Sequence, residues 1–261
     1  MKKLDEKDYC IDYFGITFDT RKTRMFLSRD NYAKIDKKGF ENDRYRKNIL
    51  NNWDYFEKLK EDKTFDFDIS NRPPALKYEK IEDELFLTDD FCNEYHNACM
   101  KNYDLNMKFI SELDDNEFNN VVNKLLEDNV LVEIKDLDNC KGKKGIYIMV
   151  LDDYKQIYVG QSSRDIRERI LRHWKKKPYF DKVLFGKAIN SVISIDSFGV
   201  CDTTRIYVMY IYENSLIDDY ERNLVNSVPK KFSLNRIGGG IHLSNGLDFL
   251  EAILTTNKRE L

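Results

Sequence analysis

Apolar and polar residues alternate along positions 145–159 in the way that two short β-strands require. Isoleucine or valine fills every second position on either side of a polar break, namely Ile146, Ile148, Val150, Ile157 and Val159. Because successive side chains of a strand point to opposite faces, these residues form one apolar face. Asp152-Asp153 supplies a turn between the two strands. The pattern predicts a β-hairpin from whose other, non-core face Tyr147 and Tyr158 project together.

The residues after this hairpin alternate between helical and strand patterns. A helix is predicted from about Arg164 to Lys176, with Ser162 or Ser163 as its N-cap, and a second helix from Ser215 to about Ser227. Between them, Arg205 to Tyr212 is rich in β-branched and aromatic residues, which favours a third strand. The sum predicts a small α/β domain with a three-stranded mixed or antiparallel sheet flanked by helices.

The first 140 residues have a different character. Residues 82–103 show a mixed helical pattern, and Ser111 to Asp128 is typical of an amphipathic helix with Ser111 as its N-cap. Val130 to Ile134 favours a short strand. Asn71-Arg72-Pro73-Pro74 is the strongest local break, because proline disfavours a helical residue before it. Residues 1–140 are therefore predicted to form a mainly helical region.

Charge divides the chain where the pattern changes. The polar segment 136–144 ends in Lys-Gly-Lys-Lys and is the best candidate for a boundary between residues 1–140 and residues 141–261. The first part holds 23 Lys and Arg against 32 Asp and Glu, and the second part holds 20 against 14, so their net charges are -9 and +6. Since a surface that binds phosphates needs positive charge, the second part is favoured for contact with nucleic acid.

Composition argues against several classes of protein. With 41% hydrophobic and 13% aromatic residues, the chain can bury a core and is unlike a disordered protein. No apolar run approaches the roughly 20 residues of a membrane-spanning helix, and the N-terminus lacks a secretory signal. The five cysteines are odd in number and form no CxxC pair, which argues against a zinc ribbon or a disulfide framework. A reducing, cytoplasmic location is expected.

Two tripeptides and four single residues follow one another in a definite order. Gly145-Ile146-Tyr147 is followed, eleven positions after its tyrosine, by the first residue of Tyr158-Val159-Gly160. Behind them come Arg169, His173, Glu221 and Asn235. This set resembles the GIY-YIG nuclease family over roughly residues 142–241. The resemblance implies the family's fold and a divalent-metal-dependent endonuclease that hydrolyses phosphodiester bonds of DNA.

The resemblance implies a role for each tyrosine. Tyr147 resembles the family tyrosine proposed to deprotonate the attacking water, and Tyr158 resembles the one that holds water or phosphate by hydrogen bonds. A phenol has an ordinary pKa near 10, which is high for a base, so Tyr147 would need help from a metal ion or a neighbouring group.

Arg169 and His173 are four residues apart and therefore lie on one face of the predicted helix. A guanidinium at this place can bind the scissile phosphate through two hydrogen bonds. By resemblance, His173 takes the tyrosine's proton or binds the phosphate. The gap between Tyr158 and Arg169 is one residue longer than usual in the family, which makes Arg167 a rival. The spacing of Arg169 and His173 favours Arg169.

Glu221 lies in line with Ile217 and Val225 on its predicted helix, so a carboxylate borders the apolar stripe. In the family this glutamate is the only protein ligand of the catalytic metal ion, which is consistent with Mg²⁺ or Mn²⁺. Asn235 resembles the family asparagine that braces the site.

Positive charge is dense along the first predicted helix of the second part. Besides Arg169, the cations are Arg164, Arg167, Arg172, Lys175, Lys176 and Lys177. Such a concentration suits a phosphate backbone, and these residues are predicted to bind the nucleic acid.

The resemblance leaves the biological role and the N-terminal region open. Restriction or phage defence is the favoured role. The alternatives are a structure-selective repair or recombination nuclease, a homing nuclease, and a non-catalytic nucleic-acid-binding module, and RNA is an alternative substrate. Residues 1–140 either read the target DNA or form a homodimer or partner-binding surface.

Overall fold

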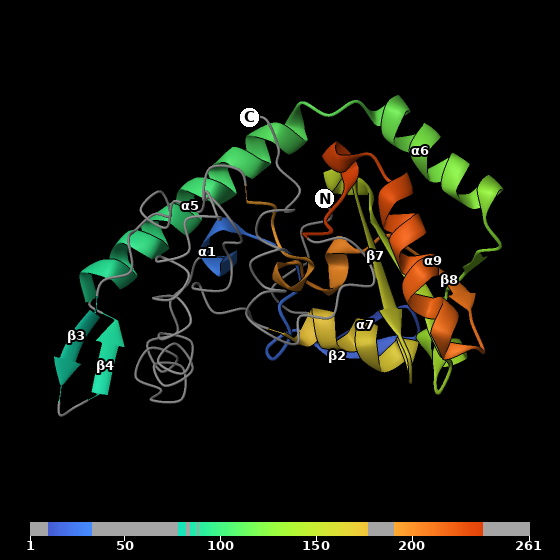
Figure 1. Ribbon diagram of the computed structural model, residues 1–261, viewed down its shortest axis with the longest axis horizontal. Helices are drawn as coiled ribbons and strands as arrows, with labels where there is room; N and C mark the ends of the chain where they lie inside the picture. Colours follow the sequence, from blue (N-terminus) through green and yellow to red (C-terminus); the bar gives the residue numbers. More distant parts are fainter. Residues whose placement is uncertain (1–9, 33–77, 82–83, 88, 177–190, 237–261) are drawn as a thin grey trace.

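The structure is a computed structural model that describes residues 10–32, 78–81, 84–87, 89–176 and 191–236 (Figure 1). Its helices are α1 (Arg29–Tyr32), α5 (Asp89–Ser111), α6 (Asp115–Asp128), α7 (Ile166–Lys175) and α9 (Asn214–Ser227). Its strands are β1 (Cys10–Tyr13), β2 (Ile16–Asp19), β3 (Tyr78–Ile81), β4 (Glu84–Leu87), β5 (Val132–Glu133), β6 (Gly145–Leu151), β7 (Gln156–Ser162) and β8 (Arg205–Tyr210). The described chain is mixed α/β, as predicted, and these strands pair antiparallel.

A four-stranded sheet with the order β5-β8-β6-β7 positions the candidate site. Its register places Tyr147 opposite Gly160 and Met149 opposite Tyr158. The three predicted strands are present, but the prediction of a three-stranded sheet is wrong. Val132 and Glu133 of β5 pair with the outer edge of β8 and extend the sheet, because unpaired backbone groups of an edge strand favour a further strand.

Both faces of this sheet are covered. The face that carries Ile146 and Ile148 packs against α6 and α9, which lie side by side in Figure 1. The face that carries Tyr147 and Met149 is also buried, beneath α7 and the N-terminal hairpin β1–β2. The prediction that Tyr147 and Tyr158 share one face is confirmed. The prediction that this face lies outside the core is wrong, because alternation along a strand does not reveal a second covering layer.

An aromatic cluster joins the hairpin β1–β2 to α7. The ring of Trp174 stacks on that of Phe14 with centroids 6.0 Å apart, and it meets Phe18 edge-on at 5.8 Å. Trp174 also donates a hydrogen bond from Nε1 to Oγ1 of Thr203 at 3.0 Å. Aromatic pairs with these geometries add stability beyond the area that they bury. The hairpin thus packs against α7 within the same buried cluster that contains Tyr147 and Met149 of the sheet.

The core crosses the predicted boundary between residues 140 and 141. A single buried cluster contains Phe18, Leu27, Tyr147 and Trp174. A polar contact reinforces it, because the backbone N–H of Leu27 donates to Oδ2 of the buried Asp202 at 2.7 Å. The described N-terminal segment and the sheet thus share one core.

Two helices are capped by residues other than those predicted. Asp114 is the N-cap of α6 and accepts a hydrogen bond from a backbone N–H three residues on at 2.7 Å, whereas Ser111 is the last residue of α5. Likewise, Asp165 caps α7 in place of Ser162 or Ser163. Both aspartates directly precede the helical run, and their negative charge suits a helix N-terminus.

The described part of residues 1–140 contains two hairpins, β1–β2 and β3–β4, besides its helices. In Figure 1, α5 extends away from the sheet and the β3–β4 hairpin lies near its far end. The prediction of a mainly helical region therefore leaves out these strands. The predicted break at residues 71–74 lies outside the described residues. None of the described helices has the length and apolar content to cross a membrane.

Candidate active site

Tyr147 on β6 and Tyr158 on β7 form the centre of the candidate site. Their ring centroids are 6.2 Å apart. Tyr147 has 0% of its surface exposed, whereas Tyr158 is partly exposed. Gly160 lies opposite Tyr147, and a Cβ atom on this glycine would lie 2.4 Å from the tyrosine hydroxyl. The glycine of the second tripeptide therefore makes room for the tyrosine of the first.

A series of hydrogen bonds links Tyr147, His173 and Asp196. The Tyr147 hydroxyl lies 2.7 Å from Nε2 of His173, and Nδ1 of His173 lies 2.6 Å from Oδ1 of Asp196. His173 is buried on α7, and Asp196 belongs to the short 3₁₀ turn Ile195–Ser197. In this arrangement the imidazole can accept a proton from the phenol while the carboxylate stabilises the positive charge that results.

Burial and hydrogen bonding set the protonation of this series. Burial raises the pKa of Tyr147 well above its ordinary value. Burial also lowers the pKa of His173, and this effect outweighs the hydrogen bond to Asp196 that would raise it. For Asp196, burial favours the neutral form, but hydrogen bonds from His173 and Lys176 together lower the pKa to about 2. At neutral pH the series therefore holds a neutral phenol, a neutral imidazole and a carboxylate.

Arg169, and not Arg167, interacts with the tyrosines. Burial raises the pKa of both Tyr147 and Tyr158, and the Arg169 guanidinium offsets part of that rise. Arg167 instead donates from Nε to Oδ1 of Asp138 at 2.7 Å. Residues two positions apart point to different sides of a helix, so only one of the two arginines can reach the tyrosines. The geometry favours Arg169 as the arginine of the candidate site.

Glu221 on α9 approaches the tyrosine pair at the β7 edge of the sheet. Its negative charge raises the pKa of Tyr147 and of Tyr158. Gln161 on β7 donates from Nε2 to Oε2 of Glu221 at 3.0 Å and to Oδ1 of Asp218 at 2.6 Å. One amide nitrogen thus brings together two carboxylates from adjacent turns of α9.

The oxygen donors of Glu221 and Asp218 suit a hard divalent cation. Mg²⁺ commonly uses one or two carboxylates and keeps several of its waters. Within the ranges that the structure describes, no group of three or more His, Cys, Asp or Glu side chains is arranged to hold a metal ion. Glu221 and Asp218, which share Gln161, supply oxygen donors of the kind that Mg²⁺ or Mn²⁺ takes.

Asn235 braces the strand that carries Tyr158. Its Nδ2 donates to the carbonyl oxygen of Val159 at 2.7 Å, and its Oδ1 accepts from the backbone N–H of Val159 at 3.0 Å. The side-chain amide thus imitates a neighbouring strand and satisfies both backbone groups of an edge residue. Its position agrees with the bracing function that the resemblance implies.

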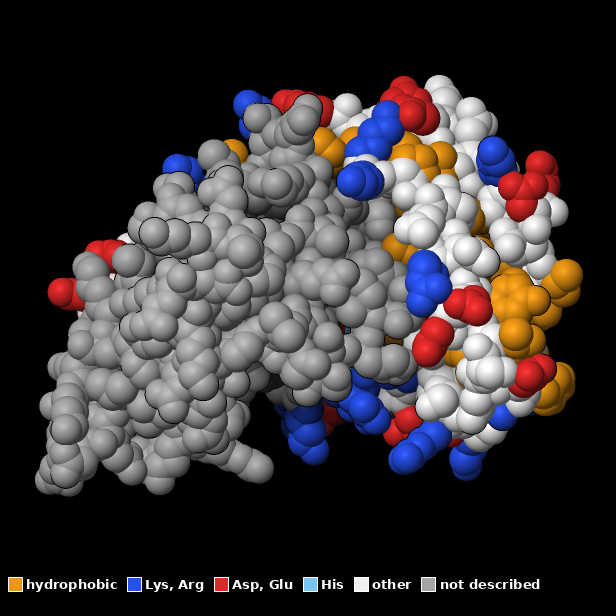
Figure 2. Space-filling model, viewed as in Figure 1, with side chains coloured by type: hydrophobic (Ala, Val, Ile, Leu, Met, Phe, Trp, Pro, Cys, Tyr) orange, Lys and Arg blue, Asp and Glu red, His pale blue; other side chains and the backbone are white. Residues whose placement is uncertain are grey.

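The predicted nucleic-acid-binding cations differ in their surroundings. Arg164, Arg172 and Lys175 are exposed. Lys176 is paired with Asp196 and Arg167 with Asp138, so these two side chains have partners within the protein. Lys177 lies outside the described residues. Figure 2 shows Lys and Arg side chains gathered along the lower edge of the molecule, where α7 runs in Figure 1.

Three residues of the site were missed by the sequence predictions. Gln161 had a readable signal, since it is a polar residue in the apolar register of β7. Asp218 is three residues before Glu221 and so lies near it on the helix. Asp196 had no readable signal in the sequence, because it follows His173 by 23 residues and belongs to no regular pattern.

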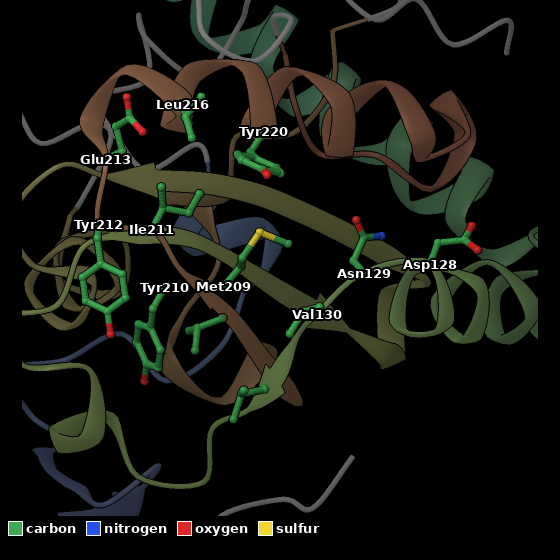
Figure 3. A pocket seen from close by; sticks show the side chains of 12 residues that line it. Asp128, Asn129, Val130, Met209, Tyr210, Ile211, Tyr212, Glu213, Leu216 and Tyr220 are labelled. Atoms are coloured by element: carbon green, nitrogen blue, oxygen red, sulfur yellow. The ribbon is translucent and has the colours of Figure 1, made fainter.

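A separate groove of about 660 Å³ lies at the β5 edge of the sheet (Figure 3). Its lining includes Val130, Met209, Tyr212, Leu216 and Tyr220. Val130 and Tyr212 are highly exposed, at 84% and 87%. None of the predicted catalytic residues lines this groove. The tyrosine pair lies on β6 and β7, toward the opposite edge.

Comparisons with models of protein families, with curated proteins and with solved structures return no match for this chain.

Proposed function

We propose that this chain is a divalent-metal-dependent endonuclease that hydrolyses phosphodiester bonds of DNA, like the GIY-YIG family that it resembles. The observation that carries the proposal is the contact between Tyr147 and His173, with Arg169 and Glu221 close enough to change the pKa of the same tyrosine. These groups come from β6, α7 and α9. A protein core costs free energy for each polar group that it buries, so such a gathering favours a chemical role.

The first task of this chemistry is to activate a water molecule. Burial disfavours a free Tyr147 phenolate, so we propose that the tyrosine oxygen takes the proton of the water while its own proton moves to Nε2 of His173. The 2.7 Å separation between these two atoms is within hydrogen-bond reach. Tyr158, whose ring lies beside Tyr147 and which is partly exposed, orients the water or the phosphate.

The second task is to stabilise negative charge on the reacting phosphate. Arg169 supplies a guanidinium beside the tyrosines, which suits two phosphate oxygens at once. Glu221, with Asp218 beside it, would hold Mg²⁺ or Mn²⁺, and the bound ion would supply further positive charge to the phosphate. Preorganised charge of this kind is usually the largest single contribution to catalysis.

The third task is to hold the DNA. The exposed cations Arg164, Arg172 and Lys175 lie on or next to α7, the helix that also carries Arg169. Backbone phosphates bind such a surface through electrostatic attraction that weakens with added salt. The role that we propose is restriction or phage defence, with structure-selective repair or recombination, and homing, as alternatives that the cleavage pattern distinguishes.

One observation favours a second candidate function, a non-catalytic nucleic-acid-binding module. Tyr147 has no exposed surface, and a base must reach the water that it deprotonates. On this reading the series from Tyr147 to Asp196 is a hydrogen-bonded part of the core, and the cations of α7 alone contact nucleic acid.

Cleavage of supercoiled plasmid with Mg²⁺ or Mn²⁺ tests the proposal. Glu221→Gln and Tyr147→Phe should each lower the rate by a factor on the order of 10³, or about 4 kcal/mol of transition-state stabilisation. Asp219→Asn is the matched control, since it removes an exposed carboxylate of the same helix whose contact is an ion pair with Arg222.

Discrete bands that both variants lose would support sequence-specific cutting, and a nick or smear that both lose would support structure-guided or degenerate cutting. No cleavage of DNA or RNA by the wild type, with binding retained, would support the binding module instead.

A further inference from the structure

Asp196 contacts His173 at the nitrogen opposite the one that faces Tyr147. Oδ1 of Asp196 lies 2.6 Å from Nδ1 of His173, and Oδ2 is paired with the ammonium of Lys176. Its backbone is held as well, because Arg24 donates from Nη2 to the carbonyl oxygen of Asp196 at 2.7 Å. Both carboxylate oxygens and the backbone of this residue thus have fixed partners.

An ionised carboxylate can only accept hydrogen bonds. The contact with Oδ1 therefore requires that Nδ1 of His173 carries a proton. In a neutral imidazole the other nitrogen, Nε2, then has a free lone pair and accepts the hydrogen bond of the Tyr147 hydroxyl. In the opposite tautomer, Nε2 would carry a proton and could take none from the phenol.

We propose that Asp196 is a positioning residue that holds His173 in the Nδ1-protonated tautomer, so that Nε2 is ready to accept the proton of Tyr147. The part of this proposal that concerns the reaction rests on the proposed nuclease function. The part that concerns the tautomer of His173 does not depend on that function. The charged or titratable groups around the imidazole are Arg169, Lys176, Asp196, Tyr147 and Tyr158. Of these, Asp196 is the one that contacts Nδ1.

The variant Asp196→Asn tests this without changing the shape of the side chain. The Lys176 ammonium only donates, so the amide oxygen should turn toward it and the amide NH₂ toward Nδ1 of His173. That NH₂ needs an acceptor, which forces the proton of the neutral imidazole to Nε2. The control Lys176→Met also removes the ion pair between Lys176 and Asp196, but it keeps the Asp196 carboxylate.

The tautomer is measured by ¹⁵N–¹³C NMR of histidine in the full chain without nucleic acid. The protein has three histidines, and His96→Gln and His242→Gln assign the signals. We expect the Nδ1-protonated form in the wild type and in Lys176→Met, and the Nε2-protonated form in Asp196→Asn. In the plasmid assay, Asp196→Asn should lower kcat roughly 10²-fold with KM little changed.

An Nε2-protonated His173 in the wild type, or a tautomer unchanged in Asp196→Asn, would overturn the proposal. A switched tautomer with unchanged kcat would overturn the part that concerns the reaction. If the wild type cleaves neither DNA nor RNA, the nuclease function fails, and the NMR result still decides whether Asp196 sets the tautomer. The wild-type measurement does not depend on Asp196→Asn, so a folding defect in that variant leaves the first test intact.

Discussion

At the scale of single residues, the two glycines of the motif have different tasks. Gly145 has a φ of 141°, and a Cβ atom on it would lie 2.0 Å from the carbonyl oxygen of Met209. Gly160 does not have a positive φ, and it is required because the Tyr147 ring lies over it. Both glycines of the motif thus meet steric demands of the sheet, and one of these demands places the proposed base.

We therefore expect Gly160→Ala to displace Tyr147. The added Cβ would lie 2.4 Å from the Tyr147 hydroxyl and 2.5 Å from Cζ, so the ring must move and its hydrogen bond to His173 must lengthen. Overpacking of this kind costs about 1–3 kcal/mol of stability. Urea unfolding measures that loss, and the plasmid assay should show cleavage falling far more than unfolding explains. Leu125→Ala is the control, because it removes a buried side chain of α6 on the other face of the sheet and should cost stability without lowering cleavage by the folded protein.

At the scale of elements, α7 joins the candidate chemistry to the N-terminal hairpin. The helix presents Arg169 and His173 to the tyrosines, while Trp174 packs among the aromatic rings of β1–β2. The contacts of the hairpin with Trp174 involve none of the proposed catalytic side chains. They nevertheless hold the helix that carries two of these side chains, Arg169 and His173. A defect in the hairpin should therefore reach the site through a shift of the helix.

Phe18→Ala tests this coupling. Phe18 is buried against Trp174, and a Phe→Ala change in a core costs about 3 kcal/mol or more. We expect a lower melting temperature, and a lower cleavage rate even at temperatures where the variant remains folded. Thr17→Ala is the control, because Thr17 is exposed on the same strand. Full cleavage by folded Phe18→Ala would show that the hairpin and the site are independent.

At the scale of the whole molecule, Asp202 ties the N-terminal segment to the sheet. Its carboxylate accepts hydrogen bonds from the backbone N–H of Leu27 and from the Tyr154 hydroxyl, each at 2.7 Å. Burial raises the pKa of Asp202 from 3.8 to about 6. The folded protein therefore holds this proton more tightly than the unfolded chain does, and the stability that this group contributes is full below about pH 4 and is lost as pH rises through 6.

The wild type should therefore lose stability relative to Asp202→Asn as pH rises from 4 to 7. The difference should approach about 3 kcal/mol, the free energy of a pKa shift of this size. Asparagine suits the site because its oxygen can accept from Leu27 and its NH₂ can donate to Tyr154. Urea unfolding at pH 4, 5, 6 and 7 measures the difference. If the free energy of unfolding changed with pH by the same amount in both proteins, the proton on Asp202 would not be linked to folding.

Local pattern predicted the β6–β7 hairpin, β8, α7 and α9, because period-2 and period-3.6 repeats of apolar residues are readable along the chain. It also predicted that Tyr147 and Tyr158 share a face, since alternation determines the side of a strand. It failed at helix starts, where Asp114 and Asp165 displaced the predicted serines. It predicted a strand at Val130 to Ile134, where β5 lies, but not the place of β5 at the edge of β8, which depends on a contact between distant segments.

The sequence by itself determined which chemical groups this protein has and which of them lie on one strand or one helix face. Only the tertiary structure decided that the tyrosine face is buried, that Arg167 is paired with Asp138, and that Asp196 contacts His173. The physical reason is the distance along the sequence over which each effect acts. Alternation and helical period act over a few residues, whereas burial and hydrogen-bond partners arise between segments that meet only when the core forms.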